Sequence, residues 1–315
     1  NLVLLTQTIF SDNHTQLICL SVSHHHQSLA VREQYSLSQS KYSDVHSILK
    51  TYSFIQECFI LSTCNRTEFY FISGDIDKIP QVLISVFTVI NPDSNINIAH
   101  WKQRSGMEAI NHFFRVCSGI DSMIVGETQI TSQIKDALNI ARSDNMTGFY
   151  LTRLVQAGLE TGKKVRTDTD ISKGAYSVSF AAVEKIKELI PAFTEKKILL
   201  IGAGNTGKLT ASWFRKKGCQ NMLVSNRNTN RGIDLAEKIQ ATYIEFDHIQ
   251  AHLQNADIIV TCTQAPTPVI TSTHIKECER DFDNHSLILV DLSVPRNIQP
   301  NISDVSGISL FTIDD

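Results

Sequence analysis

Lys197-Ile-Leu-Leu-Ile-Gly-Ala-Gly-Asn-Thr-Gly207 is the stretch of sequence that decides the fold. Lys197 to Ile201 reads as a buried strand, and it runs directly into a Gly-x-Gly-x-x-Gly pattern that opens a helix. Between a strand and a helix this pattern is a dinucleotide fingerprint, because its glycines allow a tight turn and the close approach of a pyrophosphate to the helix N-terminus. The predicted cofactor-binding residues of this loop are Gly202, Ala203, Gly204, Asn205, Thr206 and Gly207.

The next predicted strand, Met222 to Ser225, indicates which dinucleotide is bound. Asn226 and Arg227 follow it, at the place where an NAD enzyme carries an acidic residue that binds the ribose hydroxyls. An acid would repel a 2′-phosphate, whereas Ser225, Asn226 and Arg227 can bind one. The sequence therefore predicts NADPH as the cofactor.

Strands and helices alternate through the rest of this region. Further strands are predicted at residues 242–246, 257–262 and 287–292, with helices between them. This alternation predicts a doubly wound, Rossmann-type sheet over residues 191–315. Residues 261–266 end one of its strands on the side where ligands bind, so we expect them to line a nicotinamide pocket.

The N-terminal part has a different pattern. We expect strands at residues 17–23, 54–61 and 68–72, and helices at 38–50 and 75–90. This order predicts a compact α+β domain over residues 1–150. Helices over residues 151–190 would connect it to the cofactor domain. The predicted fold class is thus α/β, with an N-terminal α+β catalytic domain before a Rossmann-type NADP-binding domain.

Composition excludes several classes of protein. The 315 residues favour two domains, and 42% hydrophobic with 19% charged residues is ordinary for a globular protein. No apolar run approaches the roughly 20 residues that span a bilayer, and no signal segment opens the sequence, so we expect a cytoplasmic protein with no membrane partner. The net charge of −3 means that a nucleic acid would need a local basic patch. The amphipathic helix expected at 149–168 carries basic side chains that are read either as a solvated face or as phosphate contacts.

The seven cysteines include no Cys-x-x-Cys pair, which argues against a disulfide framework and against structural zinc. The three histidines at 24–26 lack the i, i+4 spacing of a helical metal site, so they are read as a polar turn and no metal is predicted. One thiol stands apart. Cys64 lies in a polar turn, Ser62 to Thr67, between two short strands that would present it at a loop tip.

A nucleophilic thiol must ionise near neutral pH, and a nearby cation lowers its pKa. Arg66 is two residues from Cys64. It could favour the thiolate, or it could hold a substrate carboxylate in a bidentate fork. Thr63 and Asn65 add neutral hydrogen-bonding groups to the same turn.

The segment Ser62-Thr-Cys-Asn-Arg-Thr-Glu68 resembles the active-site signature of glutamyl-tRNA reductases. Leu29-Ala-Val-Arg-Glu33 and Val290-Asp-Leu-Ser-Val-Pro-Arg296 resemble further blocks of that family, so the resemblance extends from about Leu17 to Asp315. It implies NADPH-dependent reduction of glutamyl-tRNA(Glu) to glutamate-1-semialdehyde through a thioester on Cys64. That reaction begins the C5 route to 5-aminolevulinate and the tetrapyrroles, haem included.

The resemblance also implies roles for individual residues. His112, in a helix that begins after Ser105, would transfer protons near the Cys64 thiol, and Arg66 would recognise the substrate carboxylate. Thr128 stands where family members usually carry proline. The residues expected to bind the glutamyl group are Thr63, Asn65, Arg66, Ser122, Glu127, Thr128, Gln129 and Gln133.

The partners implied are glutamyl-tRNA(Glu) and glutamate-1-semialdehyde aminomutase, which would receive the aldehyde. Members of the family continue into a helical dimerisation domain, which would begin where this sequence stops at Asp315. Either the chain is truncated or dimerisation is lost, so its oligomeric state is open.

Two other functions stay open. A cofactor-binding regulatory protein would keep the pocket and perform no turnover. An NADP-dependent oxidoreductase similar to shikimate dehydrogenase would act on a free metabolite instead of a tRNA ester.

Overall fold

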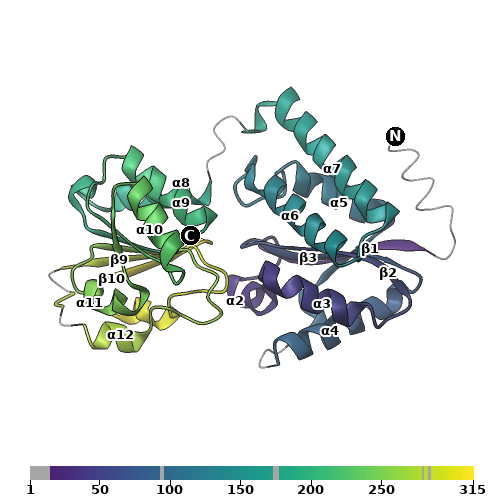
Figure 1. Ribbon diagram of the computed structural model, residues 1–315, viewed down its shortest axis with the longest axis horizontal. Coiled ribbons are helices and arrows are strands. Elements are labelled where there is room, and N and C mark those ends of the chain that lie inside the picture. The colour runs from purple at the N-terminus through teal and green to yellow at the C-terminus, as the bar shows by residue number, and fades with distance from the viewer. Residues whose placement is uncertain (1–14, 93–95, 173–176, 279, 283–284) are drawn as a thin grey trace. The chain divides into compact units, whose positions relative to one another are not determined.

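A computed structural model describes residues 15–92, 96–172, 177–278, 280–282 and 285–315. The chain divides into two units, residues 1–175 and 176–315 (Figure 1). The boundary falls within the segment 151–190 that was predicted to connect two domains. No helix in the described parts is both long enough and apolar enough to cross a membrane.

Unit 1 is built on a four-stranded sheet in the order β2-β3-β1-β4. All three pairings are antiparallel. The strands are β1 Gln16–Ser23, β2 Ile55–Ser62, β3 Arg66–Ser73 and β4 Lys102–Ser105. The predicted strands at 17–23, 54–61 and 68–72 are confirmed, and β4 was missed because Lys-Gln-Arg-Ser carries no apolar residue that would mark a strand.

Six α-helices and several 3-10 turns accompany this sheet among the described residues of unit 1. The helices are α2 Leu29–Arg32, α3 Tyr42–Leu49, α4 Ile79–Ile90, α5 Gly106–Cys117, α6 Gln129–Ser143 and α7 Phe149–Asp168. The predicted helix at 38–50 starts later than expected, because residues 39–41 form a separate 3-10 turn and the Ser38 hydroxyl bonds to Ser40 instead of capping a helix.

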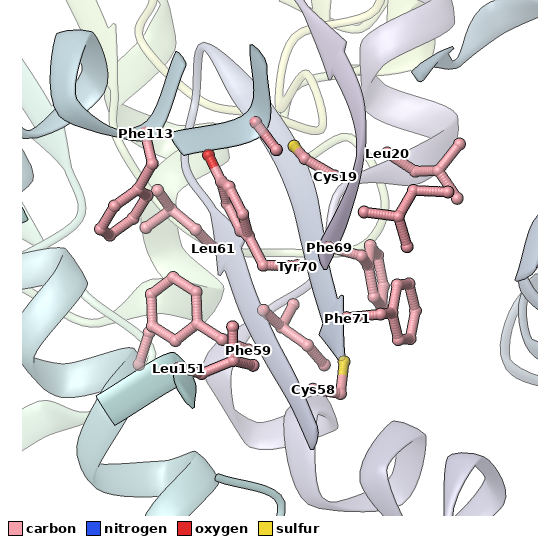
Figure 2. Close-up of a cluster of buried hydrophobic side chains, with 14 of the residues drawn as sticks. Cys19, Leu20, Cys58, Phe59, Leu61, Phe69, Tyr70, Phe71, Phe113 and Leu151 are labelled. Atoms are coloured by element: carbon pink, nitrogen blue, oxygen red, sulfur yellow. The ribbon is translucent and has the colours of Figure 1, made fainter. Parts of the chain in front are cut away.

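Alternate side chains of β3 supply the two faces of the core (Figure 2). The ring of Tyr70 packs edge-on against Phe113 of α5, with centroids 5.0 Å apart. The next residue towards the hairpin turn, Phe69, packs against Phe87 of α4 at 6.0 Å. Successive side chains of a strand point to opposite faces, so a short aromatic run holds helices on both sides of one sheet. Glu68 and Arg66 share the face of Tyr70.

The start of α7 is fixed from the neighbouring strand. Glu57 of β2 is buried, and its two carboxylate oxygens accept hydrogen bonds from the backbone N–H groups of Tyr150, at 3.1 Å, and Leu151, at 2.7 Å. These N–H groups lie in the first turn of the helix, where they have no partner within the helix itself. A carboxylate at this end also interacts favourably with the helix dipole.

Unit 2 is a six-stranded sheet in the order β10-β9-β8-β5-β6-β7, and every pairing is parallel. The strands are β5 Ile198–Ile201, β6 Met222–Ser225, β7 Thr242–Ile244, β8 Ile258–Thr261, β9 Leu287–Asp291 and β10 Ile308–Thr312. Strand order reverses beside β5, as in a doubly wound dinucleotide-binding sheet. The predicted fold class is confirmed for this unit.

The helices of unit 2 are α8 Val178–Leu189, α9 Asn205–Lys216, α10 Thr229–Lys238, α11 Ile249–Leu253 and α12 Ser272–Lys276. Residues 173–176, within the segment 151–190 that was predicted to hold connecting helices, lie outside the described residues. The two faces of the sheet bury separate apolar clusters, because Leu200 and Val224 point to one side while Leu199 and Leu223 point to the other. The final strand, β10, was not predicted.

Candidate active site

Cys64 occupies the turn of the β2–β3 hairpin, as predicted. The turn is closed by the Thr63 N–H, which donates to the Arg66 carbonyl at 2.8 Å, and the Asn65 N–H donates to the Thr63 hydroxyl at 3.2 Å. The Cys64 thiol is half-buried. The two strands thus hold the thiol on a short and well-bonded loop.

Arg66 lies inside unit 1, where its side chain is only 2% exposed. Its Nη1 donates to Glu68 Oε1 at 2.9 Å and to Asp121 Oδ2 at 3.1 Å, and its Nη2 donates to the Asp121 carbonyl oxygen. The sequence suggested that this guanidinium meets either the Cys64 thiol or a substrate carboxylate. The structure instead gives it two protein carboxylates, because its place at the start of β3 directs it to the face that Glu68 shares.

Glu68 links Arg66 to His112. His112 Nε2 lies 2.8 Å from Glu68 Oε1, and the Tyr70 hydroxyl donates to Glu68 Oε2 at 2.6 Å. Burial raises the pKa of the Glu68 carboxyl, but the charges of His112 and Arg66 outweigh burial and hold that pKa well below its usual range. The carboxylate is therefore ionised and orients the imidazole of His112.

The thiol itself is not acidified in this structure. Burial first, and then the negative charge of Glu127, raise the pKa of Cys64 to about 12. Arg32 and Arg66 act in the opposite direction, with Arg32 the stronger of the two arginines. Arg66 thus acts on the thiol in the direction that the sequence suggested, but burial and the charge of Glu127 outweigh both arginines.

Two residues beside Cys64 were missed in the sequence. Arg32, at the end of α2, donates from Nη1 to the Cys64 carbonyl oxygen at 3.0 Å. The backbone N–H of His24 donates to the next carbonyl along the loop, that of Asn65, at 3.0 Å. The histidine run at 24–26 was read only as a polar turn. The segment around Arg32 was noted as family-like, but Arg32 was not assigned a role. Pairing of Ser23 with Arg66 in the sheet brings that turn to the thiol loop.

The other residues predicted to bind the glutamyl group lie between α5 and α6 and in the first turns of α6. Glu127 is half-buried, and its charge acts on Cys64, so the fold brings these two together. Burial also raises the pKa of the Glu127 carboxyl. Ser122 is buried, Thr128 is exposed at the N-cap of α6, and Gln129 and Gln133 are half-buried.

One group of side chains in the described parts has the geometry to hold a metal ion. The ligand atoms of Cys19, Glu68 and His112 lie within 4.8 Å of one another, and all three residues are buried. Both oxygens of Glu68 already accept hydrogen bonds, and the guanidinium of Arg66 occupies the same carboxylate. A cation would therefore compete with a buried positive charge, and nothing in the chemistry of the cluster favours one.

The glycine-rich loop of unit 2 has the tight turn that a dinucleotide requires. Gly202 has φ +119°, and a Cβ on Gly207 would lie 2.0 Å from the Gly202 carbonyl oxygen. At Gly204, the N-cap of the twelve-residue helix α9, a Cβ would meet nothing within 4 Å. The loop is thus closed by its first and third glycines and open at the second, beside a helix N-terminus that favours phosphate.

The three residues predicted to bind the 2′-phosphate differ in their exposure to solvent. Arg227 is exposed with its guanidinium 5.6 Å from the Phe246 ring centroid, whereas Ser225 is fully buried in β6. Asn226 bridges two loops, because its Oδ1 accepts the Ala203 N–H at 2.9 Å and its Nδ2 donates to the Asn228 carbonyl at 2.8 Å. Of the three, Arg227 has the exposure that a phosphate ligand needs.

The loops after β8 and β9 are tied together at the carboxyl edge of the sheet. Asp291 is 1% exposed and accepts hydrogen bonds from the Thr261 hydroxyl and from the N–H groups of Ser293, Asn297 and Ile298, at 2.7 to 3.0 Å. The segment 261–266 that was expected to line a nicotinamide pocket is therefore held in place from β9.

Comparison with known proteins matches the two units to two families. Residues 20–169 match the family described as glutamyl-tRNAGlu reductase, N-terminal domain. Residues 184–315 match the family described as shikimate / quinate 5-dehydrogenase. These ranges follow the division of the chain into two units.

Relatives that match nearly the whole length of this chain were also found. A glutamyl-tRNA reductase from Syntrophobacter fumaroxidans is 35% identical over 301 residues, which are 95% of this chain and 65% of that protein. A glutamyl-tRNA reductase from Pelotomaculum thermopropionicum is 33% identical over 95% of this chain and 68% of its own length. The solved glutamyl-tRNA reductase from Methanopyrus kandleri is 29% identical with a TM-score of 0.47, covering 95% of this chain and 71% of that one. The chain spans about two thirds of the length of these relatives.

Proposed function

The chain belongs to the glutamyl-tRNA reductase family, and from that premise we propose that it reduces glutamyl-tRNA(Glu) to glutamate-1-semialdehyde with NADPH. The observation that carries the proposal is the half-buried Cys64 thiol on its hairpin turn, with Arg66 at the end of that turn bound to the buried Glu68, which also holds His112. The aldehyde would be the substrate of glutamate-1-semialdehyde aminomutase on the route to 5-aminolevulinate.

The proposed first step is acyl transfer to sulfur. The Cys64 thiolate attacks the ester carbonyl carbon, a C–S bond forms, and the C–O bond to the terminal ribose of the tRNA breaks. The ribose oxygen takes up a proton, and the tRNA leaves with a free hydroxyl. One difficult reduction of an ester thereby becomes two easier reactions through a thioester.

His112 is the proposed proton-transfer residue for this step. Glu68 binds one ring nitrogen at 2.8 Å, so the proposed proton-exchanging position is the other nitrogen, Nδ1, which lies 3.8 Å from Asp121 Oδ2. Arg66 is proposed to act through Glu68 and Asp121, because both of its terminal nitrogens donate hydrogen bonds to these residues. In this assignment Arg66 is a positioning residue and does not itself clamp the substrate carboxylate.

Glu127 is the proposed partner of the substrate's α-ammonium group. A half-buried carboxylate whose pKa is raised by burial gains most from a cation that arrives beside it. Once paired, Glu127 no longer opposes ionisation of Cys64. Ser122, Gln129 and Gln133 would complete the polar lining of this pocket.

The cofactor is proposed to be NADPH bound to unit 2, which would supply the hydride that converts the thioester to an aldehyde and a thiolate. The residues present fit the group: the space beside Gly204 admits a pyrophosphate at the N-terminus of α9, and Arg227 is exposed for a 2′-phosphate. Asp291 would keep the adjoining loops in position.

The rival function, oxidation or reduction of a free metabolite, rests on the match of residues 184–315 to the shikimate and quinate dehydrogenases. That match concerns the cofactor unit, whereas the substrate-binding residues proposed here belong to unit 1. A regulatory protein without turnover would bind NADPH and leave Cys64 unacylated.

The test is acylation of Cys64. Protein is mixed with glutamyl-tRNA without a reductant, and its peptides are analysed by mass spectrometry. We expect one glutamyl group on Cys64, none on a Cys64→Ser variant, and an unchanged adduct in a Cys278→Ser variant, which removes the other half-exposed thiol. NADPH oxidation is then compared with glutamyl-tRNA and with free glutamate. Turnover by Cys64→Ser would exclude the thioester, and equal use of free glutamate would exclude dependence on tRNA.

A further inference from the structure

We propose that Arg32 is a positioning residue for Cys64: it fixes the thiol loop through the Cys64 carbonyl and supplies the positive charge that favours the thiolate. This inference deepens the proposed function, because it concerns the nucleophile on which that function depends. It assigns to α2 the role that the sequence suggested for Arg66.

The contact that carries the inference joins two segments distant in sequence. Arg32 is the last residue of α2 and is 3% exposed, and its Nη1 donates to the Cys64 carbonyl oxygen at 3.0 Å. A guanidinium stays charged at every pH of interest, so the contact places a permanent cation on the backbone of the residue that carries the sulfur. His24, on the connection from β1 to α2, donates its backbone N–H to the adjacent Asn65 carbonyl.

Three charged groups act on the Cys64 thiol, one from each element around it. Glu127 precedes α6 and opposes ionisation, Arg66 begins β3, and Arg32 ends α2. Arg66 is bound to two carboxylates and makes no hydrogen bond to Cys64 among those found in the described residues. Arg32 donates a hydrogen bond to the thiol residue itself, and of the two arginines it lowers the pKa of Cys64 more.

A consequence is that the thiol responds to its substrate. With Glu127 ionised, burial and that negative charge together keep the pKa of Cys64 raised, so the thiol reacts slowly. A substrate ammonium on Glu127 would cancel the negative charge that opposes ionisation of Cys64. Removing the charge of Arg32 should therefore slow the reaction of the thiol, and removing the charge of Glu127 should speed it up.

The experiment measures the rate at which iodoacetamide alkylates Cys64 between about pH 7 and pH 10, since only the thiolate reacts. Peptide-resolved mass spectrometry separates Cys64 from Cys278, the other half-exposed thiol, which serves as the internal control. The variants are Arg32→Gln, which removes the charge, Arg32→Lys, which retains it, and Glu127→Gln, which removes the opposing charge. No tRNA or cofactor is needed.

We expect Arg32→Gln to slow alkylation of Cys64 about tenfold at a given pH, which is one unit of thiol pKa. Arg32→Lys should stay within about threefold of the wild type, and Glu127→Gln should react several times faster. Cys278 should alkylate at one rate throughout. An unchanged Cys64 rate in Arg32→Gln, or an equal loss in Arg32→Lys and Arg32→Gln, would overturn the inference.

Folding is checked in the same samples, because an unfolded variant would also alkylate the five buried cysteines. If Arg32→Gln unfolds, the comparison of Arg32→Lys with Glu127→Gln decides: a Lys variant slowed tenfold or more counts against Arg32 as the source of charge. Failure of the two proposals is distinguishable. If the wild type forms no glutamyl adduct but the Arg32 variants change the alkylation rate of Cys64, only the proposed reaction is excluded. If the adduct forms and the alkylation rate does not change in the Arg32 variants, only the role of Arg32 is excluded.

Discussion

His112 Nε2 lies 2.8 Å from Glu68 Oε1, in the interior of unit 1. Arg66 donates to the same oxygen, and Tyr70 donates to the other. A single carboxylate thus fixes a histidine from α5, an arginine and a tyrosine from its own strand. Its loss would affect both the stability of the fold and the orientation of the imidazole.

Glu68→Gln is expected to destabilise the protein by about 3 kcal/mol, because it removes one partner of a buried ion pair. Urea unfolding measures this loss. The matched control is Asp44→Asn, whose ion pair with Lys41 is exposed and which should leave stability nearly unchanged. Equal losses in the two variants would contradict the role of Glu68.

The same residue predicts a pH dependence. The folded-state pKa of Glu68 is lowered from 4.5, so its contribution to stability is present above that value and is lost as the pH falls below it. The wild type should therefore lose more stability than Glu68→Gln on acidification below about pH 4.5. Parallel curves for the two proteins would argue against an ionised carboxylate.

His24 should add a second pH-dependent term at higher pH. Burial first, and then the positive charges of His25 and Arg66, lower its pKa from 6.5 to about 4. Folding keeps the ring neutral while the unfolded chain takes up a proton, so stability is lost as the pH falls from 6.5 towards 4. His24→Asn should remove about 1 kcal/mol of that loss, a figure reduced because the ring is half-exposed. Thermal unfolding at pH 7 and pH 4.5 measures it, and an identical loss in both proteins would contradict the prediction.

Two glycines of the cofactor loop should behave oppositely. Gly207→Ala places a methyl group 2.0 Å from the Gly202 carbonyl oxygen and should cost about 3 kcal/mol of stability. Gly204→Ala meets nothing within 4 Å, so it should fold normally and instead weaken NADPH binding, because its methyl group fills the space beside the N-terminus of α9. Urea unfolding and fluorescence titration with NADPH separate the two effects. A Gly204→Ala protein with wild-type affinity would exclude this approach of the pyrophosphate.

Arg227→Ala should raise the KM for NADPH about tenfold or more while leaving the KM for NADH unchanged, since only NADPH carries the 2′-phosphate. The NADH measurement on the same protein is the control. Equal increases for both nucleotides would mean that Arg227 serves the fold or the adenine ring instead.

Local patterns in the sequence predicted much of the fold for clear physical reasons. The apolar run before Gly202 and the aromatic run from Glu68 to Ile72 are short, continuous signals, and both are strands in the structure. β4 lacked such a signal, whereas the Ile-Ser-Leu-Phe-Thr sequence of β10 carries one that was overlooked. The order of strands in the sheet of unit 1 depends on contacts between segments far apart in the chain, which no local pattern contains.

The candidate site was predictable as a location and less so as a set of contacts. Cys64 stands on the predicted turn, but the partner that engages Arg66 from outside the hairpin is Asp121, 55 residues further on. The partner of the thiol loop, Arg32, lies 32 residues before it. Charge pairs of this kind are invisible until the sheet brings β1, β3 and the end of α5 together. The roles proposed for the other site residues stay predictions.

Asn226 illustrates why coenzyme preference in this chain resists simple redesign. Its amide both accepts from the Ala203 N–H and donates to the Asn228 carbonyl, so it sets the spacing between the glycine turn and the start of α10. An aspartate there would keep the acceptor and lose the donor. Evolution towards NADH would thus require a compensating change at the neighbouring loop, and laboratory selections that vary position 226 alone should stall.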